Sequence, residues 1–103
     1  MIRYTTPTIT LKIPAVLPQE AKVIASIRQK QIQLDKEVIA ITRGDKATTL
    51  VISLTQEESS RFCSRDPVLV QVNWITPGGM REATKVASVV AFDNLLDKVI
   101  TYA

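Results

Sequence analysis

The sequence predicts an all-β protein, an antiparallel β-sandwich of immunoglobulin-like style with about seven strands and one short helical turn. Apolar and polar residues alternate from Thr8 to Ile13 and again from Val68 to Trp74, and this two-residue period is typical of half-buried strands. Pro77-Gly78-Gly79 ends the second run, because glycine tolerates positive φ and proline cannot donate to a ladder. Ala83 to Phe92, rich in Val and Ala, then forms the return strand of a long hairpin.

The length of 103 residues predicts a single domain, residues 1–103, large enough to bury about two-thirds of its unfolded surface. No apolar run approaches the roughly 20 residues of a membrane span. Met1 to Pro7 lacks the apolar stretch of a signal peptide, so we expect no secretion by that route. One cysteine, Cys63, excludes an internal disulfide and is consistent with a reducing compartment.

The first half of the chain is predicted to form strands. Thr8 to Ile13 is the first of them, and Pro14 and Pro18 bracket the loop that follows. Lys22 to Arg28 resumes the pattern, Gln29 to Gln31 is the expected turn, and Ile32 to Leu34 is a short return strand. A helix from Gln19 to Lys36 is the competing interpretation, because Gln, Lys, Glu and Ala favour helix.

A second hairpin is predicted from Val38 to Thr42 and from Ala47 to Leu54. If Gly44 and Asp45 form its loop, these residues lie opposite each other: Ile39 and Leu50, Ile41 and Thr48.

The long hairpin allows two registers. Pairing without a bulge places Val72 opposite Lys85, which brings a charge onto the core face. A bulge at Gly78-Gly79 instead places Val72 opposite Val86 and Val68 opposite Val90. We favour the bulged register.

Two short segments have helical signatures. Thr55 to Glu58 reads as a capping box, so we expect one or two helical turns from Gln56 to Phe62, with Phe62 as a core anchor. Asp93-Asn94 precedes an apolar segment whose Leu96, Val99 and Ile100 share one face at helical spacing. Residues 93–103 are therefore predicted to be a C-terminal docking segment, which either contacts a neighbour or closes the chain's own core. The predicted core comprises these residues: Ile9, Leu11, Val23, Ile27, Ile39, Ile52, Leu54, Phe62, Val70, Val72 and Trp74.

The residues that could take part in catalysis or binding each have a structural explanation. Histidine is absent, which removes the commonest general base and metal ligand. Cys63 then lacks the usual base of a thiol nucleophile, and Trp74 continues an apolar strand face. Arg43-Gly44-Asp45 spells an integrin-recognition tripeptide, but Gly-Asp is also good turn chemistry. We predict no enzyme activity and no catalytic, cofactor-binding or metal-binding residues.

The net charge of +3 comes from 13 basic and 10 acidic residues. The densest basic run, Arg28 to Lys36, contains an acid and several glutamines, which is more typical of a solvated strand face than of a phosphate-binding surface. A small basic barrel-like nucleic-acid-binding protein is the alternative function, motivated by a pI of about 9.2.

Five stretches resemble a family of small structural proteins of tailed bacteriophages and prophages of Firmicutes. They are the opening Ile2 to Leu11, the corner Leu54 to Glu58, the strand Val70 to Trp74, the Ala83-Thr84 strand and the close near Val99-Ile100. In kind, the chain is similar to the immunoglobulin-like adaptor domains of phage baseplates and virions. The chain departs from it at Arg28 to Lys36, where the family usually has a glycine-containing turn.

The resemblance implies a non-enzymatic structural or accessory protein of the head, tail or baseplate. It would be located in the virion, or in the bacterial host cytoplasm during assembly. Its partners would be other phage structural proteins or further copies of itself, without membrane contact and without cofactors. We expect the termini to supply the interface, through these residues: Tyr4, Thr6, Leu96, Val99, Ile100 and Tyr102.

Overall fold

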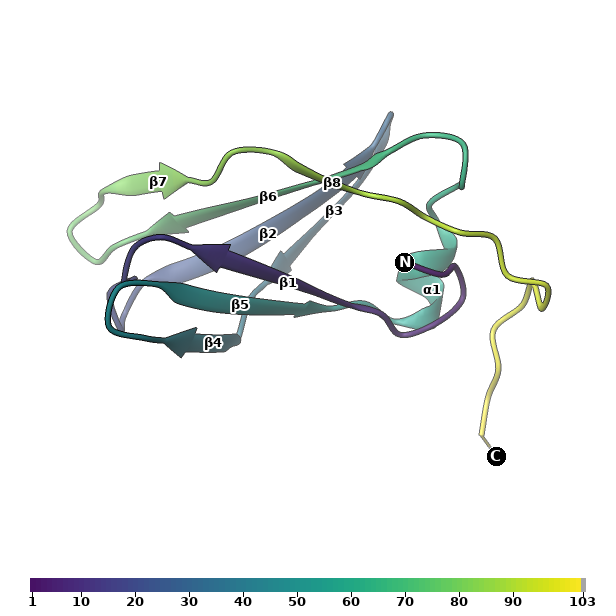
Figure 1. Cartoon of the computed structure of the whole chain (residues 1–103), viewed down its shortest axis with the longest axis horizontal. Coiled ribbons are helices and arrows are strands. Elements are labelled where there is room, and N and C mark those ends of the chain that lie inside the picture. Colours follow the sequence, from purple (N-terminus) through teal and green to yellow (C-terminus); the bar gives the residue numbers. More distant parts are fainter. Residues whose placement is uncertain (103) are drawn as a thin grey trace.

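The computed structural model describes residues 1–102 as two antiparallel β-sheets and one short helix that share one apolar core (Figure 1). A mostly β fold with one helical turn was predicted, and both features are confirmed. The elements follow in this order: β1 (Thr8–Ile13), β2 (Lys22–Gln29), β3 (Ile32–Glu37), β4 (Ala40–Arg43), β5 (Thr48–Ser53), α1 (Gln56–Ser60), β6 (Val68–Ile75), β7 (Arg81–Ala83) and β8 (Ala87–Val89).

One sheet has three strands in the order β1-β5-β4, and the other has five. In the five-stranded sheet the order is β3-β2-β6, and both β7 and β8 pair with the far edge of β6. The chain passes from β3 to β4 through Val38 and Ile39 alone, and the Val38 amide donates to the Val23 carbonyl at 2.8 Å. The edges β3 and β4 therefore lie on one side of the molecule, here called the joined side. The edges β1 and β7–β8 form the opposite side, here called the open side.

Alternating burial explains why these segments are strands rather than a helix. Val23, Ala25 and Ile27 of β2 are at most 1% exposed, while the residues between them face outward. The competing helix from Gln19 to Lys36 is wrong, because a period of two lets β2 bury one face in the core. Lys30 adopts φ of 54° in the tight turn that joins β2 to β3.

Most of the predicted core residues are buried, with two exceptions. Leu11 is half-buried, and Ile39 is 88% exposed rather than buried. The prediction for Ile39 is wrong because the chain crosses between the sheets at this point. Val38 turns into the core with 5% exposure, so its neighbour turns outward.

The β4–β5 hairpin has a longer loop than predicted. Ile41 lies opposite Leu50, not Thr48, and Arg43 lies opposite Thr48. The predicted register is therefore wrong by two residues, although a shift of two leaves each side chain on the same face. Two contacts account for the observed register: the apolar pair of Ile41 and Leu50, and the Thr48 hydroxyl, which donates to the Ala15 carbonyl at 2.8 Å.

The long hairpin contains a bulge, but not at its glycines. Three steps along β6, from Asn73 to Val70, correspond to four steps from Ala83 to Ala87 on the partner strand, so the extra residue lies between β7 and β8. The pairing of Val68 with Val90 is wrong, because Val89 occupies that position. The predicted pairing of Val72 with Val86 is also wrong, because the Val72 backbone bonds to Thr84.

At the bulge, the Thr84 side chain replaces a ladder partner. The Val72 amide donates to the Thr84 hydroxyl at 3.1 Å, and the Thr84 amide donates to the Val72 carbonyl at 2.9 Å. Because of the bulge, Lys85 points away from the core and is exposed. The sequence pattern indicated that a bulge was needed to keep this charge out of the core, but it did not locate the bulge.

Helix α1 begins with the predicted capping box. The Thr55 hydroxyl accepts from the Glu58 amide and the Glu58 carboxylate accepts from the Thr55 amide. The helix ends at Ser60, earlier than predicted, and Phe62 is fully buried as the expected anchor. Lys36 of β3 donates to Glu58 at 2.7 Å and to the Ser53 carbonyl at 2.6 Å, so one lysine links the end of β3, the end of β5 and α1.

Candidate interaction surface

The predicted N-terminal contact segment is bound to its own chain. The Arg3 amide donates to the Phe92 carbonyl and the Phe92 amide to the Met1 carbonyl, which makes a parallel bridge between Ile2 and Phe92. Farther on, Ser59 donates to the Thr5 carbonyl. The backbone of the residues before Thr8 is therefore held in part by contacts within the chain.

The predicted contact residues Tyr4 and Thr6 lie on this bound segment. Tyr4 is half-buried at φ of 62°, with the Arg3 guanidinium 5.4 Å from its ring centroid. Thr6 is exposed. Both side chains reach the surface to different extents, and their part in an interface stays a prediction.

Arg3 connects the N-terminus to α1 and to the C-terminal segment. Its guanidinium donates to the Ser60 carbonyl at 2.8 Å and lies 3.5 Å from Asp93 and 3.9 Å from Asp97. Asn94 adds a bond from its side-chain amide to the Arg3 carbonyl at 3.0 Å. These contacts fix the point at which residues 93–102, here called the tail, leave the body of the protein.

The tail is irregular rather than helical. Leu96, Val99 and Ile100 therefore do not form the predicted helical face. The Ile100 amide and carbonyl both bond to the Gln56 side-chain amide, at 2.8 and 3.0 Å. In Figure 1 the tail leads away from both sheets.

Apolar side chains remain exposed along the tail and beside it. In the tail, Leu95 and Tyr102 are fully exposed, and Ile100 is 58% exposed. Next to it lies a second group, here called the terminal patch. Its members share the outward face of the sheet around the Ile2–Phe92 bridge and are each about 40–60% exposed: Ile2, Leu69, Val90 and Phe92. An apolar cluster that stays exposed next to an apolar tail is typical of a protein–protein contact.

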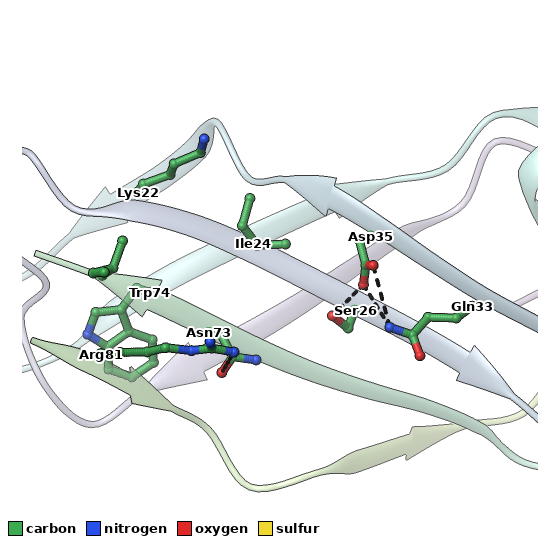
Figure 2. Close-up of a pocket in the computed structure, with 9 residues that line it drawn as sticks. Lys22, Ile24, Ser26, Gln33, Asp35, Asn73, Trp74 and Arg81 are labelled. Atoms are coloured by element: carbon green, nitrogen blue, oxygen red, sulfur yellow. Dashed lines mark hydrogen bonds between the residues drawn. The ribbon is translucent and has the colours of Figure 1, made fainter. Parts of the chain in front are cut away.

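A second surface feature is an open trough of about 430 Å³ on the solvent face of the five-stranded sheet (Figure 2). Strands β3, β2, β6 and β7 contribute its lining: Lys22, Ile24, Ser26, Gln33, Asp35, Asn73, Trp74, Ile75 and Arg81. Lys22, Ile75 and Arg81 lie side by side on neighbouring strands, so two cations flank one end. Asp35 lies toward the other end.

Asp35 is held in its ionised form. Hydrogen bonds from Ser26 at 2.6 Å and from Gln33 at 3.1 Å lower the pKa of the Asp35 carboxyl below its ordinary value. A carboxylate with a lowered pKa is a weak general base at neutral pH. The trough therefore offers hydrogen bonds and charges of both signs. The sequence did not reveal it, because its residues come together only when four strands align.

The other residues singled out in the sequence serve the fold. The Arg43 guanidinium donates to the carbonyls of Leu17 and Pro18, both at 2.8 Å, so the arginine of the Arg-Gly-Asp tripeptide holds the β1–β2 loop. Cys63 is half-buried, with its sulfur 3.9 Å from an Asp66 oxygen. Trp74 is 7% exposed and belongs to the core.

Residues 1–102 hold no group of three or more Cys, Asp or Glu side chains placed to bind a metal ion. Within the same residues, no helix has the length and apolar character needed to cross a bilayer. Comparison with known proteins gives no match to a family model, to a curated protein or to a solved structure.

Proposed function

We propose that this chain is a non-enzymatic structural or accessory protein of a tailed bacteriophage or prophage particle, and that it acts through protein–protein contacts. We further propose that its two sheets form an immunoglobulin-like β-sandwich of the kind used as an adaptor in virions. The observation that carries the proposal is the exposed apolar surface formed by the terminal patch and the tail. The sequence resemblance in the opening segment, the Leu54 to Glu58 corner and the later strands supports the phage origin.

The terminal patch is the strongest support for a contact function. Val90 and Phe92 are 58% and 56% exposed, although they flank Ala91, which is 1% exposed. Alternation therefore places two large apolar side chains outward at the point where the chain's two ends meet. Burying the part of each side chain that remains exposed contributes about 1–1.5 kcal/mol, roughly half the value for a fully exposed apolar side chain.

The test uses the phage or prophage that encodes the chain. Particles carrying the wild type, the double variant Val90→Ser/Phe92→Ser, or the control Ile39→Ser are purified, and the chain is quantified by mass spectrometry. Ile39 is a suitable control because it is 88% exposed and lies in the β3–β4 connection. We expect the double variant to be depleted by about tenfold or more, and the control to be incorporated normally.

Absence of the wild-type chain from purified particles would overturn the proposal. Retention of the wild type on a nucleic-acid column, weakening steeply with added salt, would instead favour the nucleic-acid-binding alternative.

A further inference from the structure

The outer edge of β1 is unpaired. β1 pairs with β5 alone, and the bond from the Leu54 amide to the Pro7 carbonyl sets which residues of β1 face that partner. In an antiparallel ladder the bonded positions alternate, so Ile9, Leu11 and Ile13 bond to β5. The N–H and C=O groups of Thr8, Thr10 and Lys12 consequently point to the open side.

This edge lacks the usual protection against strand addition. Natural edge strands are commonly interrupted by proline, by several charges or by a bulge. β1 runs for six residues without proline, with an unbroken register to β5 and with Lys12 as its one charge. By contrast, the edge strand β3 carries Asp35, Lys36 and Glu37 in succession.

The facing sheet extends farther than β1 does. The three-stranded sheet is one strand narrower than the five-stranded sheet, in which β7 and β8 share one edge. Because β3 and β4 are joined at the other side, the missing strand is the one next to β1. Burial agrees with this: Ala87 lies on the same face as buried Val70 but is exposed, and Leu11 is half-buried while its partner Leu50 is fully buried.

The tail has the properties of a strand that has no sheet. Val99, Ile100, Thr101 and Tyr102 are all β-branched or aromatic, the residue types that favour strands. The backbone of these four residues pairs with no strand. Among them, the Gln56 side chain bonds only to the N–H and C=O groups of Ile100. The ten residues of the tail can span up to about 33 Å when extended, and β1 is about 20 Å long.

We propose that β1 of one copy accepts the tail of a second copy as an added strand, a deepening of the proposed contact function on which it rests. The added strand would bond to Thr8, Thr10 and Lys12 and cover Ala87, the exposed residue on the inner face of β8. A second copy is the fitting donor because the chain's own tail leaves the body in the direction away from both sheets, anchored by Arg3 and Gln56 (Figure 1). Each copy both donates a tail and accepts one, so the contact either closes as a reciprocal dimer or a larger ring, or continues as a filament.

The test measures amide hydrogen exchange of the full chain over a range of protein concentrations, alongside its mass by light scattering. In the wild type, we expect exchange at Thr8, Thr10 and Lys12 to slow by about tenfold or more as oligomers form. Thr10→Pro should abolish both effects, because it removes an N–H that faces the open side and leaves the β5 pairing intact. Thr10→Val keeps the N–H and is the matched control.

Ile100→Asp on the donor side provides a second test that does not alter β1, and its exposed position spares the fold. It should also abolish oligomers and protection. Protection that is independent of concentration would mean that the tail folds back on its own β1, and this would overturn the inference. A chain that stays monomeric, or that oligomerises with β1 amides unprotected, would overturn it too. In either case, normal incorporation of the chain into particles would leave the proposed function standing.

Discussion

The joined side and the open side of the molecule are stabilised in different ways. On the joined side, Val38 bonds across to β2 while it fills the core, and Lys36 ties β3 to Ser53 and Glu58. On the open side, no hydrogen bond or ion pair in residues 1–102 links β1 to β7 or β8. In the described residues, the open side therefore leaves the outer backbone groups of β1 without a partner strand.

Polar contacts at the end of β2 also fix the connection from α1 to β6. Gln29, at the end of β2, is 2% exposed, and its side chain bonds to the Cys63 amide and carbonyl and to the Asp66 carbonyl, all at 2.7–2.8 Å. A buried backbone group that loses its partner costs about 1–3 kcal/mol. We therefore expect the removal of a buried polar side chain here to lower the free energy of unfolding substantially.

The largest expected effect belongs to Gln29→Leu, which keeps the size of the side chain but leaves three backbone groups unpaired. We expect a loss of about 3 kcal/mol in the free energy of unfolding and a fall in Tm on the order of 15 °C. Urea and thermal unfolding measure it. Gln31→Leu, in the exposed turn, is the control and should change little. Equal unfolding midpoints for Gln29→Leu and the wild type would contradict this account of the buried amide.

Glu58→Gln is expected to have the next largest effect. Burial alone would raise the pKa of Glu58, but the hydrogen bond from Lys36, the Thr55 amide and the charge of Lys36 together hold it below its ordinary value of 4.5. A carboxyl whose pKa is lowered by folding stabilises the protein above its unfolded pKa, and this stability is lost as the pH falls through the folded pKa. At pH 7 we expect Glu58→Gln to cost about 1–2 kcal/mol, since glutamine preserves the capping box but not the charge.

The pH dependence separates the ion pair from the cap. The difference in unfolding free energy between the wild type and Glu58→Gln should narrow as the pH falls from about 5 to below 4. Glu57→Gln, in the same helical turn but exposed, is the control and should follow the wild type. A difference that stays constant over this range would contradict the assignment of the effect to the charge of Glu58.

The sequence was informative where structure depends on near neighbours. The strand from Thr8 to Ile13 and the capping box at Thr55 were predicted with the bounds and bonds that the structure has, because alternation and capping are local. Ile39 was placed wrongly because its burial depends on where the chain crosses between sheets. Gln29 gave no signal, since its partners lie 34 and 37 positions along the chain.

The candidate surface was predictable in composition but not in shape. The apolar content of the tail was visible in the sequence, and Leu95, Ile100 and Tyr102 are exposed as a contact segment requires. The helical spacing of its apolar residues wrongly predicted a helix. The N–H and C=O groups of Ile100 bond to the Gln56 side chain instead of to a helical turn. The terminal patch depends on the pairing of Ile2 with Phe92, 90 positions apart, and no local pattern encodes that contact.

The smallest expected effect is at the bulge on the open side. Thr84→Val removes the hydroxyl that accepts from the Val72 amide but keeps the volume of the side chain. Thr84 is half-buried, so water can take over part of the bond, and we expect a loss of about 1 kcal/mol. Thr84→Ser retains the hydroxyl and should lie closer to the wild type in urea unfolding. A loss for Thr84→Val as large as that for Gln29→Leu would show that the bulge is locked as firmly as the joined side. The open side would then be a rigid edge rather than one that can adjust to an added strand, and the contrast between the two sides would rest on the unpaired groups of β1 alone.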